Sequence, residues 1–341
     1  MELYPLKFFP IYKNKIWGGN RLKTFLNRDI EEENVGESWE ISTNNDSISI
    51  VKNGGYKNQK LTELIEEFPE ELLGDRYNSA GQFPLLLKII DATKKLSVQV
   101  HPNDKLAKEL ENGNGKSEMW YVLSATKNAK LYIGLNDIKG KNHLREVIEQ
   151  GKLQNYLNAI NVQRGDFFYI PAGTVHAIGS GLMLVEIQQN SDTTYRLYDW
   201  NRIDENGKSR DLHLGKGIKA TDLNSNIERY ESIYKKETPE YKRKVLTISN
   251  HFVSEKVTVK NYFKLDHNDF ALITCIENNG LIKYGEDNVE TLKEGESAMI
   301  PANLKDVEVE GKLEFLYIYI PDDINYYIQK LKSKGFTSFN L

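Results

Sequence analysis

The sequence predicts a mainly β protein with two jelly-roll-like barrels and a few short helices. Three observations lead to this prediction: most of the chain divides into short β-rich segments, helical periodicity is confined to a few stretches, and one motif occurs twice. Short strands at close spacing are typical of sandwiches and barrels, and the jelly roll is one such arrangement. The 341 residues leave room for about two domains, taking roughly 150 residues per domain as a guide.

The predicted strands are rich in β-branched and aromatic residues and are bounded by Gly, Asn, Asp or Pro. The 19 tyrosines and 13 phenylalanines supply large side chains for a β-rich core. The predicted strands cover residues 97–101, 119–123, 130–133, 167–170, 182–188, 194–200, 270–276 and 313–320.

Helical patterns are few and short. Pro69 interrupts the first of them, so we expect two short helices there. Asp104 is the expected N-cap of the second, and Gly151 weakens the middle of the third. The predicted helical stretches cover residues 61–73, 104–111, 144–157 and 324–334.

One eight-residue motif occurs twice, at residues 165–172 and 295–302. Both copies contain Gly, an acidic residue, three further residues and then Ile-Pro-Ala, which predicts a turn, a strand and a second turn. The repeat predicts two related β-barrel modules, connected by residues 228–244. The alternative is an accidental repeat, with the C-terminal part forming some other β fold.

Composition and charge exclude several classes of protein. The formal net charge of −4 gives no general attraction to nucleic acid, and no apolar run approaches the ~18 residues of a membrane span. The N-terminus lacks a secretory apolar stretch, so we expect a cytoplasmic protein without membrane or nucleic-acid partners. The single cysteine, Cys275, excludes an intramolecular disulfide and a Cys-rich zinc site.

Polar residues with metal-binding chemistry lie in three segments. Strand alternation places Gln99 and His101 on one face, and Lys116 and Glu118 on one face of the next strand. A Pro-Ala-Gly turn brings His176 to the start of a further strand. Two imidazoles, a carboxylate and an amide suit zinc or another borderline divalent metal and leave open positions. Each residue taken alone also fits a packed or solvent-facing role.

At these residues the chain resembles type I mannose-6-phosphate isomerases, most closely the short bacterial form. The resemblance is dense from about residue 10 to residue 202 and thinner toward the C-terminus. The segments that carry it are Gln99-Val-His101-Pro, Gly115-Lys-Ser-Glu118-Met-Trp, Ile170-Pro-Ala-Gly-Thr-Val-His176-Ala-Ile and Glu186-Ile-Gln-Gln-Asn-Ser-Asp192-Thr-Thr-Tyr-Arg196, with Trp17-Gly-Gly19 and Gly36-Glu-Ser-Trp-Glu-Ile-Ser42 as further support.

The resemblance implies a cupin fold and one zinc ion per chain. The implied ligands are Gln99, His101, Glu118 and His176. It also implies an active-site lysine at Lys116 and an active-site arginine at Arg196, with Asp192 as the acidic partner of that arginine. We therefore expect a catalytic, metal-binding cupin domain at residues 1–240 and a cupin-like domain without metal at residues 241–341.

The implied reaction interconverts mannose 6-phosphate and fructose 6-phosphate through an enediol. Zinc would position and polarise the sugar oxygens, Arg196 would hold the enediolate oxygen, and Lys116 would hold the sugar or transfer protons. Glu186 and Asp192 are the carboxylate candidates for the proton-transfer base, with zinc-bound water as a third candidate. Composition alone suggests Lys13, Lys15 and Arg202 as phosphate contacts.

Two other functions fit a cupin. A cupin dioxygenase would use a redox metal, usually with more histidine ligands than this sequence offers. A sugar-binding cupin without activity would not require a metal, a lysine and an arginine around one cavity. Iron content and oxygen uptake would identify the first, and absence of fructose 6-phosphate production would identify the second.

Overall fold

The computed structural model describes residues 3–44, 46–77, 83–203, 207–225, 234–321 and 323–333. Two compact units account for the chain. The first unit comprises Tyr12–Trp39 and Leu85–Arg229, and the second comprises Met1–Ile11, Glu40–Pro84 and Tyr230–Leu341. Two N-terminal segments therefore belong to the second unit. The predicted boundary at residue 240 assigns these two segments to the N-terminal domain instead. The predicted division of function between a catalytic domain and a metal-free domain stays a prediction.

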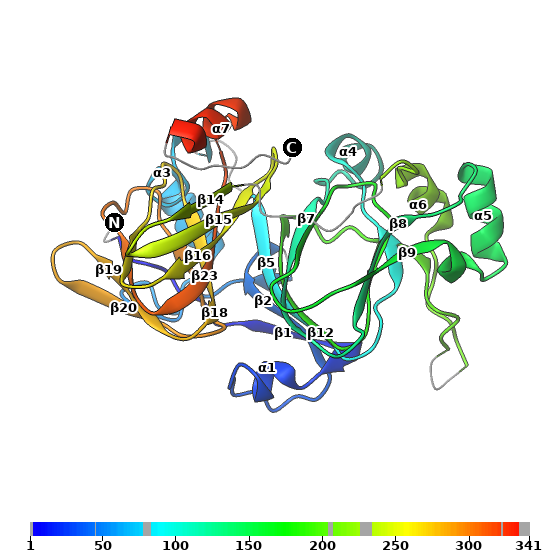
Figure 1. Cartoon of the computed structure of the whole chain (residues 1–341), viewed down its shortest axis with the longest axis horizontal. Helices are drawn as coiled ribbons and strands as arrows, with labels where there is room; N and C mark the ends of the chain where they lie inside the picture. The colour runs from blue at the N-terminus through cyan, green and yellow to red at the C-terminus, as the bar shows by residue number, and fades with distance from the viewer. Residues whose placement is uncertain are drawn as a thin grey trace. The chain divides into compact units, whose positions relative to one another are not determined.

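The first unit is a sandwich of two antiparallel sheets (Figure 1). Apolar side chains from both sheets meet in its core, among them Trp120, Phe168, Ile133 and Ile178. The larger sheet contains, in order, β1 (Ile11–Gly19), β2 (Val35–Ile41), β5 (Leu85–Ala92), β12 (Leu182–Gln189), β7 (Glu118–Ala125) and β10 (Phe167–Ile170). The smaller sheet contains β13 (Tyr195–Tyr198), β6 (Val98–Val100), β11 (His176–Ile178), β8 (Lys130–Leu135) and β9 (Leu157–Asn161).

The second unit is also a two-sheet sandwich, coloured yellow to orange in Figure 1. Its larger sheet contains, in order, β14 (Tyr234–Glu237), β15 (Tyr241–Ile248), β16 (Val253–Val259), β23 (Leu313–Tyr319), β18 (Ala271–Glu277) and β21 (Ser297–Ile300). The smaller sheet contains β17 (Tyr262–Lys264), β22 (Glu308–Gly311), β19 (Gly280–Tyr284) and β20 (Asn288–Leu292). A short ribbon joins β3 (Thr43–Asn44) and β4 (Ser47–Ile48).

The two sandwiches repeat one strand order. The run β5-β12-β7-β10 corresponds to β16-β23-β18-β21, and β6-β11-β8-β9 corresponds to β17-β22-β19-β20. The motif glycines match as well, since Gly165 and Gly295 both have positive φ (91° and 79°). Each donates its amide at 2.9 Å to a carbonyl of the neighbouring strand, at Val122 and Cys275. The predicted fold class, mainly β with two cupin-like jelly rolls, is confirmed; the sheets form open sandwiches rather than closed barrels.

The repeat does not extend to the residue that follows the second turn. Counting five residues from each motif proline places Asp306 opposite His176, but His176 is the first residue of β11 while β22 begins only at Glu308. Asp306 lies in the turn, with 77% of its side chain exposed, and pairs with Lys264 at 2.6 Å. The second copy therefore has a turn that is longer by two residues.

The helices are short, as expected. Pro69 separates α2 (Leu61–Glu67) from α3 (Pro69–Leu73), which confirms the predicted split. The expected helix at residues 144–157 is wrong in length: α5 (Lys141–Glu149) ends before Gly151, where φ is +66°, and a single 3-10 turn follows at Leu153–Tyr156. The others are α1 (Arg21–Thr24), α4 (Asp104–Glu111), α6 (Leu214–Ala220), α7 (Ile324–Ser333) and the 3-10 turn Asp75–Tyr77.

The start of α4 differs from the prediction by one residue. Asn103, not Asp104, is the N-cap, and its Oδ1 accepts the amide of Leu106 at 2.9 Å. Asp104 instead accepts from the Gly115 amide and from the side chain of Gln189, each at 2.9 Å. This carboxylate therefore fixes the loop that leads into β7. Within the described ranges, no helix is long and apolar enough to cross a membrane.

Candidate active site

Three strands of the first unit bring the predicted metal ligands together. Gln99 lies in β6 and pairs directly with His176, the first residue of β11, while His101 follows β6 immediately. Glu118 is the first residue of β7 in the facing sheet. The ligand atoms of His101, Glu118 and His176 all lie within 4.8 Å of one another, in the interior of the sandwich.

Two main-chain carbonyls set the orientation of the imidazoles. Nδ1 of His101 lies 2.9 Å from the Thr193 carbonyl, and Nδ1 of His176 lies 2.9 Å from the Thr174 carbonyl. Because a carbonyl only accepts, Nδ1 carries the proton and the Nε2 lone pair faces the cluster. Burial lowers the pKa of His176 to about 4, and burial together with the Lys116 ammonium lowers the pKa of His101 well below its usual range. Both rings are therefore neutral near pH 7.

Glu118 completes the cluster with oxygen ligands. Its Oε1 lies 3.2 Å from Nε2 of His176, and its Oε2 lies 3.5 Å from Nε2 of His101. Oε1 is buried and has no hydrogen-bond partner among the described residues. Burial raises the pKa of Glu118 to about 7, although the Lys116 ammonium acts in the opposite direction. An acceptor oxygen that faces acceptor nitrogens fits a divalent cation, because the cation would satisfy all of them.

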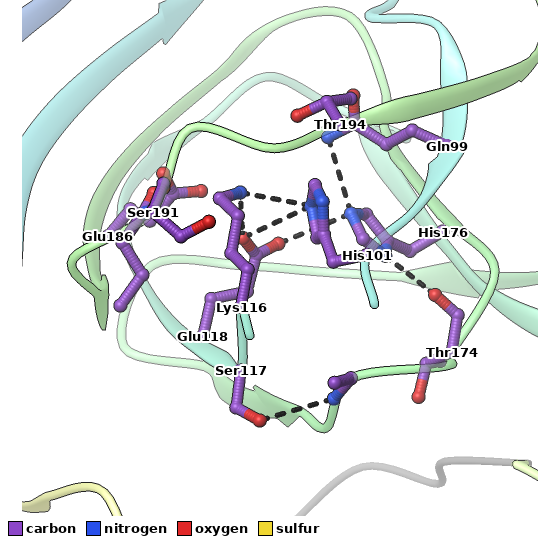
Figure 2. Close-up of polar contacts among 12 residues, drawn as sticks. Gln99, His101, Lys116, Ser117, Glu118, Thr174, His176, Glu186, Ser191 and Thr194 are labelled. Carbon is purple, nitrogen blue, oxygen red and sulfur yellow. Dashed lines mark hydrogen bonds and ion pairs between the residues drawn. The ribbon is translucent and has the colours of Figure 1, made fainter. Parts of the chain in front are cut away.

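Lys116 and Gln99 border this cluster (Figure 2). The Lys116 ammonium donates to Oε2 of Glu118 at 2.6 Å and to Nε2 of His101 at 2.9 Å. The Gln99 amide nitrogen lies 3.3 Å from Nε2 of His176. Rotation of the amide by 180° would place its oxygen there, so Gln99 also fits a ligand role.

A pocket of about 340 Å³ opens beside the cluster. This volume lies within the range of small-molecule sites. Its lining includes Gln99 and all four residues predicted for the chemistry, namely Lys116, Glu186, Asp192 and Arg196. These predicted residues therefore line one cavity, while their roles stay a prediction.

Comparison with known proteins places the chain in a family. Residues 6–147 match the phosphomannose isomerase type I catalytic domain, and residues 242–320 match the mannose-6-phosphate isomerase cupin domain. Mannose-6-phosphate isomerase ManA of Bacillus subtilis is 39% identical over 325 residues, which cover 94% of this chain and 100% of that protein. The chain belongs to the type I phosphomannose isomerase family. Its predicted class, an isomerase enzyme, is thereby confirmed.

Further relatives agree with this family. Mannose-6-phosphate isomerase of Streptococcus mutans is 39% identical over 306 residues, covering 89% of this chain and 94% of that protein. The crystal structure of the mannose 6-phosphate isomerase from Bacillus subtilis has a TM-score of 0.86 and 34% identity, and the match covers 93% of this chain and 99% of that chain. The likeness thus extends over both units.

The phosphomannose isomerase pocket contains a buried lysine that was not among the predicted site residues. Lys88, in β5, is 7% exposed and donates to Oε1 of Gln188 at 2.8 Å and to Oε1 of Glu186 at 3.2 Å. Burial alone would lower its pKa, but the carboxylates of Glu186, Glu37 and Glu118 outweigh that effect and raise it. The sequence feature that could have indicated this buried lysine is its position as the single charged residue in the apolar run of residues 84–90.

Glu186 is held rigidly in this isomerase pocket. Trp120 Nε1 donates to its Oε2 at 2.8 Å, and Lys88 contacts its other oxygen. Burial would raise the pKa of Glu186, but Lys88, Lys116 and the Trp120 hydrogen bond lower it below the ordinary value. Glu186 is therefore a charged carboxylate with both oxygens engaged.

Arg196 does not pair with Asp192, contrary to what the resemblance implied. The structure records no ion pair between these two described residues. Arg196 Nη1 donates instead to the Asp211 carbonyl at 2.8 Å, and its Nε lies 3.4 Å from the Ser97 hydroxyl. Burial and the neighbouring Arg210 lower the pKa of Arg196 relative to a free arginine. Asp192 lies three residues beyond Gln189, where β12 ends, and it is exposed in the lining of the pocket.

Proposed function

We propose that this enzyme interconverts mannose 6-phosphate and fructose 6-phosphate with one zinc ion held by Gln99, His101, Glu118 and His176. The observation that carries the proposal is the cluster of two neutral imidazoles and an unpartnered carboxylate oxygen beside a polar pocket. Family membership supports the reaction, and the nitrogen and oxygen ligands suit zinc.

The reaction moves a proton between C1 and C2 of an open-chain sugar. The free-energy barrier arises because negative charge develops on oxygen when a carbon beside a carbonyl loses a proton. A zinc ion held by the four ligands would supply a Lewis acid for the sugar oxygens. Arg196 supplies a permanent cation on the same pocket wall, and Lys116 supplies an ammonium group next to the ligands.

The two carboxylates that could transfer the proton differ in their surroundings. Glu186 accepts hydrogen bonds from Trp120 and Lys88, and its lowered pKa makes it a weak base. Asp192 is exposed in the pocket wall, where a substrate could reach it. We therefore assign proton transfer to Asp192 and assign Glu186 to the positioning of Lys88.

One coupled assay tests the proposal. Zinc-loaded protein should produce fructose 6-phosphate from mannose 6-phosphate and catalyse the reverse reaction, whereas a chelator should abolish turnover and added zinc should restore it. Unphosphorylated mannose should be a much poorer substrate. Absence of turnover by the zinc-loaded protein would show that the proposed function is wrong. Family membership leaves the dioxygenase and the non-catalytic sugar-binding cupin without a supporting observation.

A further inference from the structure

A second hollow, of about 370 Å³, adjoins the active-site pocket in the first unit. Its lining consists of Arg196, Lys208, Ser209, Arg210, Asp211 and His213. Arg196 and Arg210 line both the hollow and the active-site pocket. One molecule could therefore extend from the metal ligands into the hollow past these two guanidinium groups.

Among the described residues, cationic side chains outnumber acidic ones in the lining of this hollow. Arg210 Nε donates to Oδ2 of Asp199 at 2.8 Å, and Arg202 pairs with the same carboxylate. Asp199 thus pairs with two guanidinium groups, while Arg196 donates to the Asp211 carbonyl and to the Ser97 hydroxyl. Among the described residues that line the hollow, three side chains are cationic (Arg196, Lys208 and Arg210) and one is acidic (Asp211).

We infer that this hollow binds the phosphate group of the sugar phosphate, with Arg210, Lys208 and Ser209 as its contacts. This inference rests on the proposed function. A guanidinium fork matches the oxygens of a phosphate, and Asp199 holds Arg210 in a fixed orientation. With the phosphate there, the sugar would extend toward Gln99 and Lys116 in the adjoining pocket.

The opposite wall of the active-site pocket is a weaker candidate. Lys15 is paired with Glu37 at 3.3 Å, and the ammonium group of Lys13 lies 5.2 Å from the centre of the Trp39 ring. Lys88 is occupied by Glu186 and Gln188. Lys15 and Lys88 are therefore balanced by carboxylates, and Lys13 lies over an aromatic ring. Arg202 is tied to Asp199 and to the Lys95 carbonyl, so it supports Arg210 rather than reaching a ligand.

Steady-state kinetics with inorganic phosphate as a competing probe test the inference. Arg210→Gln and Lys208→Gln should each raise the KM for mannose 6-phosphate and the inhibition constant for inorganic phosphate roughly 10- to 100-fold, the range expected for one charged hydrogen bond. Both variants should change kcat much less, because the phosphate group takes no part in the proton transfer. Ser209→Ala should act in the same direction with a smaller effect.

The matched control is Lys219→Gln. This exposed lysine of α6 pairs with Glu109 at 2.6 Å, outside both hollows, so its removal changes the net charge by the same amount. Its KM and phosphate inhibition should equal those of the wild type. Since Arg210→Gln also removes a partner of Asp199, thermal unfolding checks that variant, and Lys208→Gln tests the hollow without disturbing the ion pair.

The result that overturns the inference is a folded Arg210→Gln and a folded Lys208→Gln that both keep wild-type KM and phosphate inhibition. A larger rise of both constants in Lys15→Gln would place the phosphate at the opposite wall and would overturn it as well. If the wild type fails to turn over mannose 6-phosphate, the proposed function is wrong, and calorimetry still decides the hollow. Inorganic phosphate should then bind the wild type but not Arg210→Gln, and equal binding to both would contradict the inference.

Discussion

At the scale of single residues, the proposed metal site depends on two carbonyls that orient two imidazoles. The carbonyls of Thr193 and Thr174 hold the rings of His101 and His176 so that both Nε2 atoms face Glu118. We expect His101→Ala and His176→Ala each to lose tightly bound zinc together with isomerase activity, because a buried site with one ligand fewer binds the ion far more weakly. Metal analysis after dialysis, in parallel with the isomerase assay, measures both effects.

The control for these variants is His143→Ala. His143, on α5, contacts the ring of Tyr156 and has no part in the cluster. This variant should keep the zinc content and the rate of the wild type. A His101→Ala or His176→Ala protein with full metal content and full rate would remove that histidine from the ligand set.

Local sequence rules predicted the residues of the cluster but not their partners. Alternation along a strand placed Gln99 and His101 on one face, and the resemblance to the family added Glu118 and His176 to the same set. Lys88 could not be assigned to the site, because its partners Glu186 and Gln188 lie about a hundred positions away in the chain. The expected ion pair between Arg196 and Asp192 was wrong for a similar reason. The loop that contains Asp211 follows later in the chain, and its folding decides which groups approach Arg196.

At the scale of secondary structure elements, the acidic residue of the repeat has a structural role in the second unit. Glu296 accepts from Lys7 at 2.8 Å and from Lys52 at 2.9 Å, so it ties two N-terminal segments to β21. Burial would raise the pKa of Glu296, but the two lysines lower it from 4.5 to about 2. A carboxyl group with a lowered pKa in the folded state stabilises the fold when it is ionised.

Glu296→Gln should therefore lower the free energy of unfolding at pH 7, on the order of 1–3 kcal/mol. The loss should be full above about pH 4.5 and should shrink as the pH falls toward 2, because the wild-type carboxyl group then becomes neutral as well. Denaturant unfolding at pH 7, 4.5 and 3 measures the trend. Glu66→Gln, which changes an exposed carboxylate of α2 in the same unit, should have little effect at any of these pH values. A Glu296→Gln deficit that does not change with pH would contradict the explanation.

Element boundaries show where local propensity was sufficient. Pro69 divides α2 from α3 as its chemistry requires. Residues 144–157 carry an apolar face along their whole length, yet Gly151 takes a left-handed conformation and ends α5 early. The helical period continued beyond the helix because Leu153 packs into the same core from a 3-10 turn. Periodicity reported burial correctly but not backbone conformation.

At the scale of the whole molecule, an eight-residue repeat predicted two sandwiches with matching strand order. The grouping of Met1–Ile11 and Glu40–Pro84 with the second unit could not be predicted. Those segments are joined to the second unit by contacts between residues far apart in the sequence, such as the bridge between Leu6 and Met299. No local sequence pattern predicts such a pairing. The repeat was informative because its turn and strand form the edge strand of the larger sheet in both sandwiches, β10 in the first and β21 in the second.

Strand register shows which residues of the second sandwich stand at the positions of the proposed ligand Glu118 and of Lys88. Glu118 lies opposite Ile170 in the first repeat, and Ala271 lies opposite Ile300 in the second, so an alanine stands where the first sandwich has its carboxylate. In the same way, Lys88 lies opposite Glu186, and Glu255 lies opposite Tyr317. Lys88 therefore corresponds to Glu255, which is completely buried and paired with Arg243.

The second sandwich should accordingly bind no metal, and the whole chain should bind one zinc ion. Its interior offers a methyl group at the ligand position and an ion pair nearby, and its histidines, His251 and His267, lie in no cluster of three ligands among the described residues. Metal analysis of the dialysed wild type should give about one zinc ion per chain. His251→Ala and His267→Ala should leave that value unchanged, in contrast to the two cluster histidines. Two tightly bound ions per chain, or loss of the ion in either second-unit variant, would show that the second sandwich has a metal site of its own.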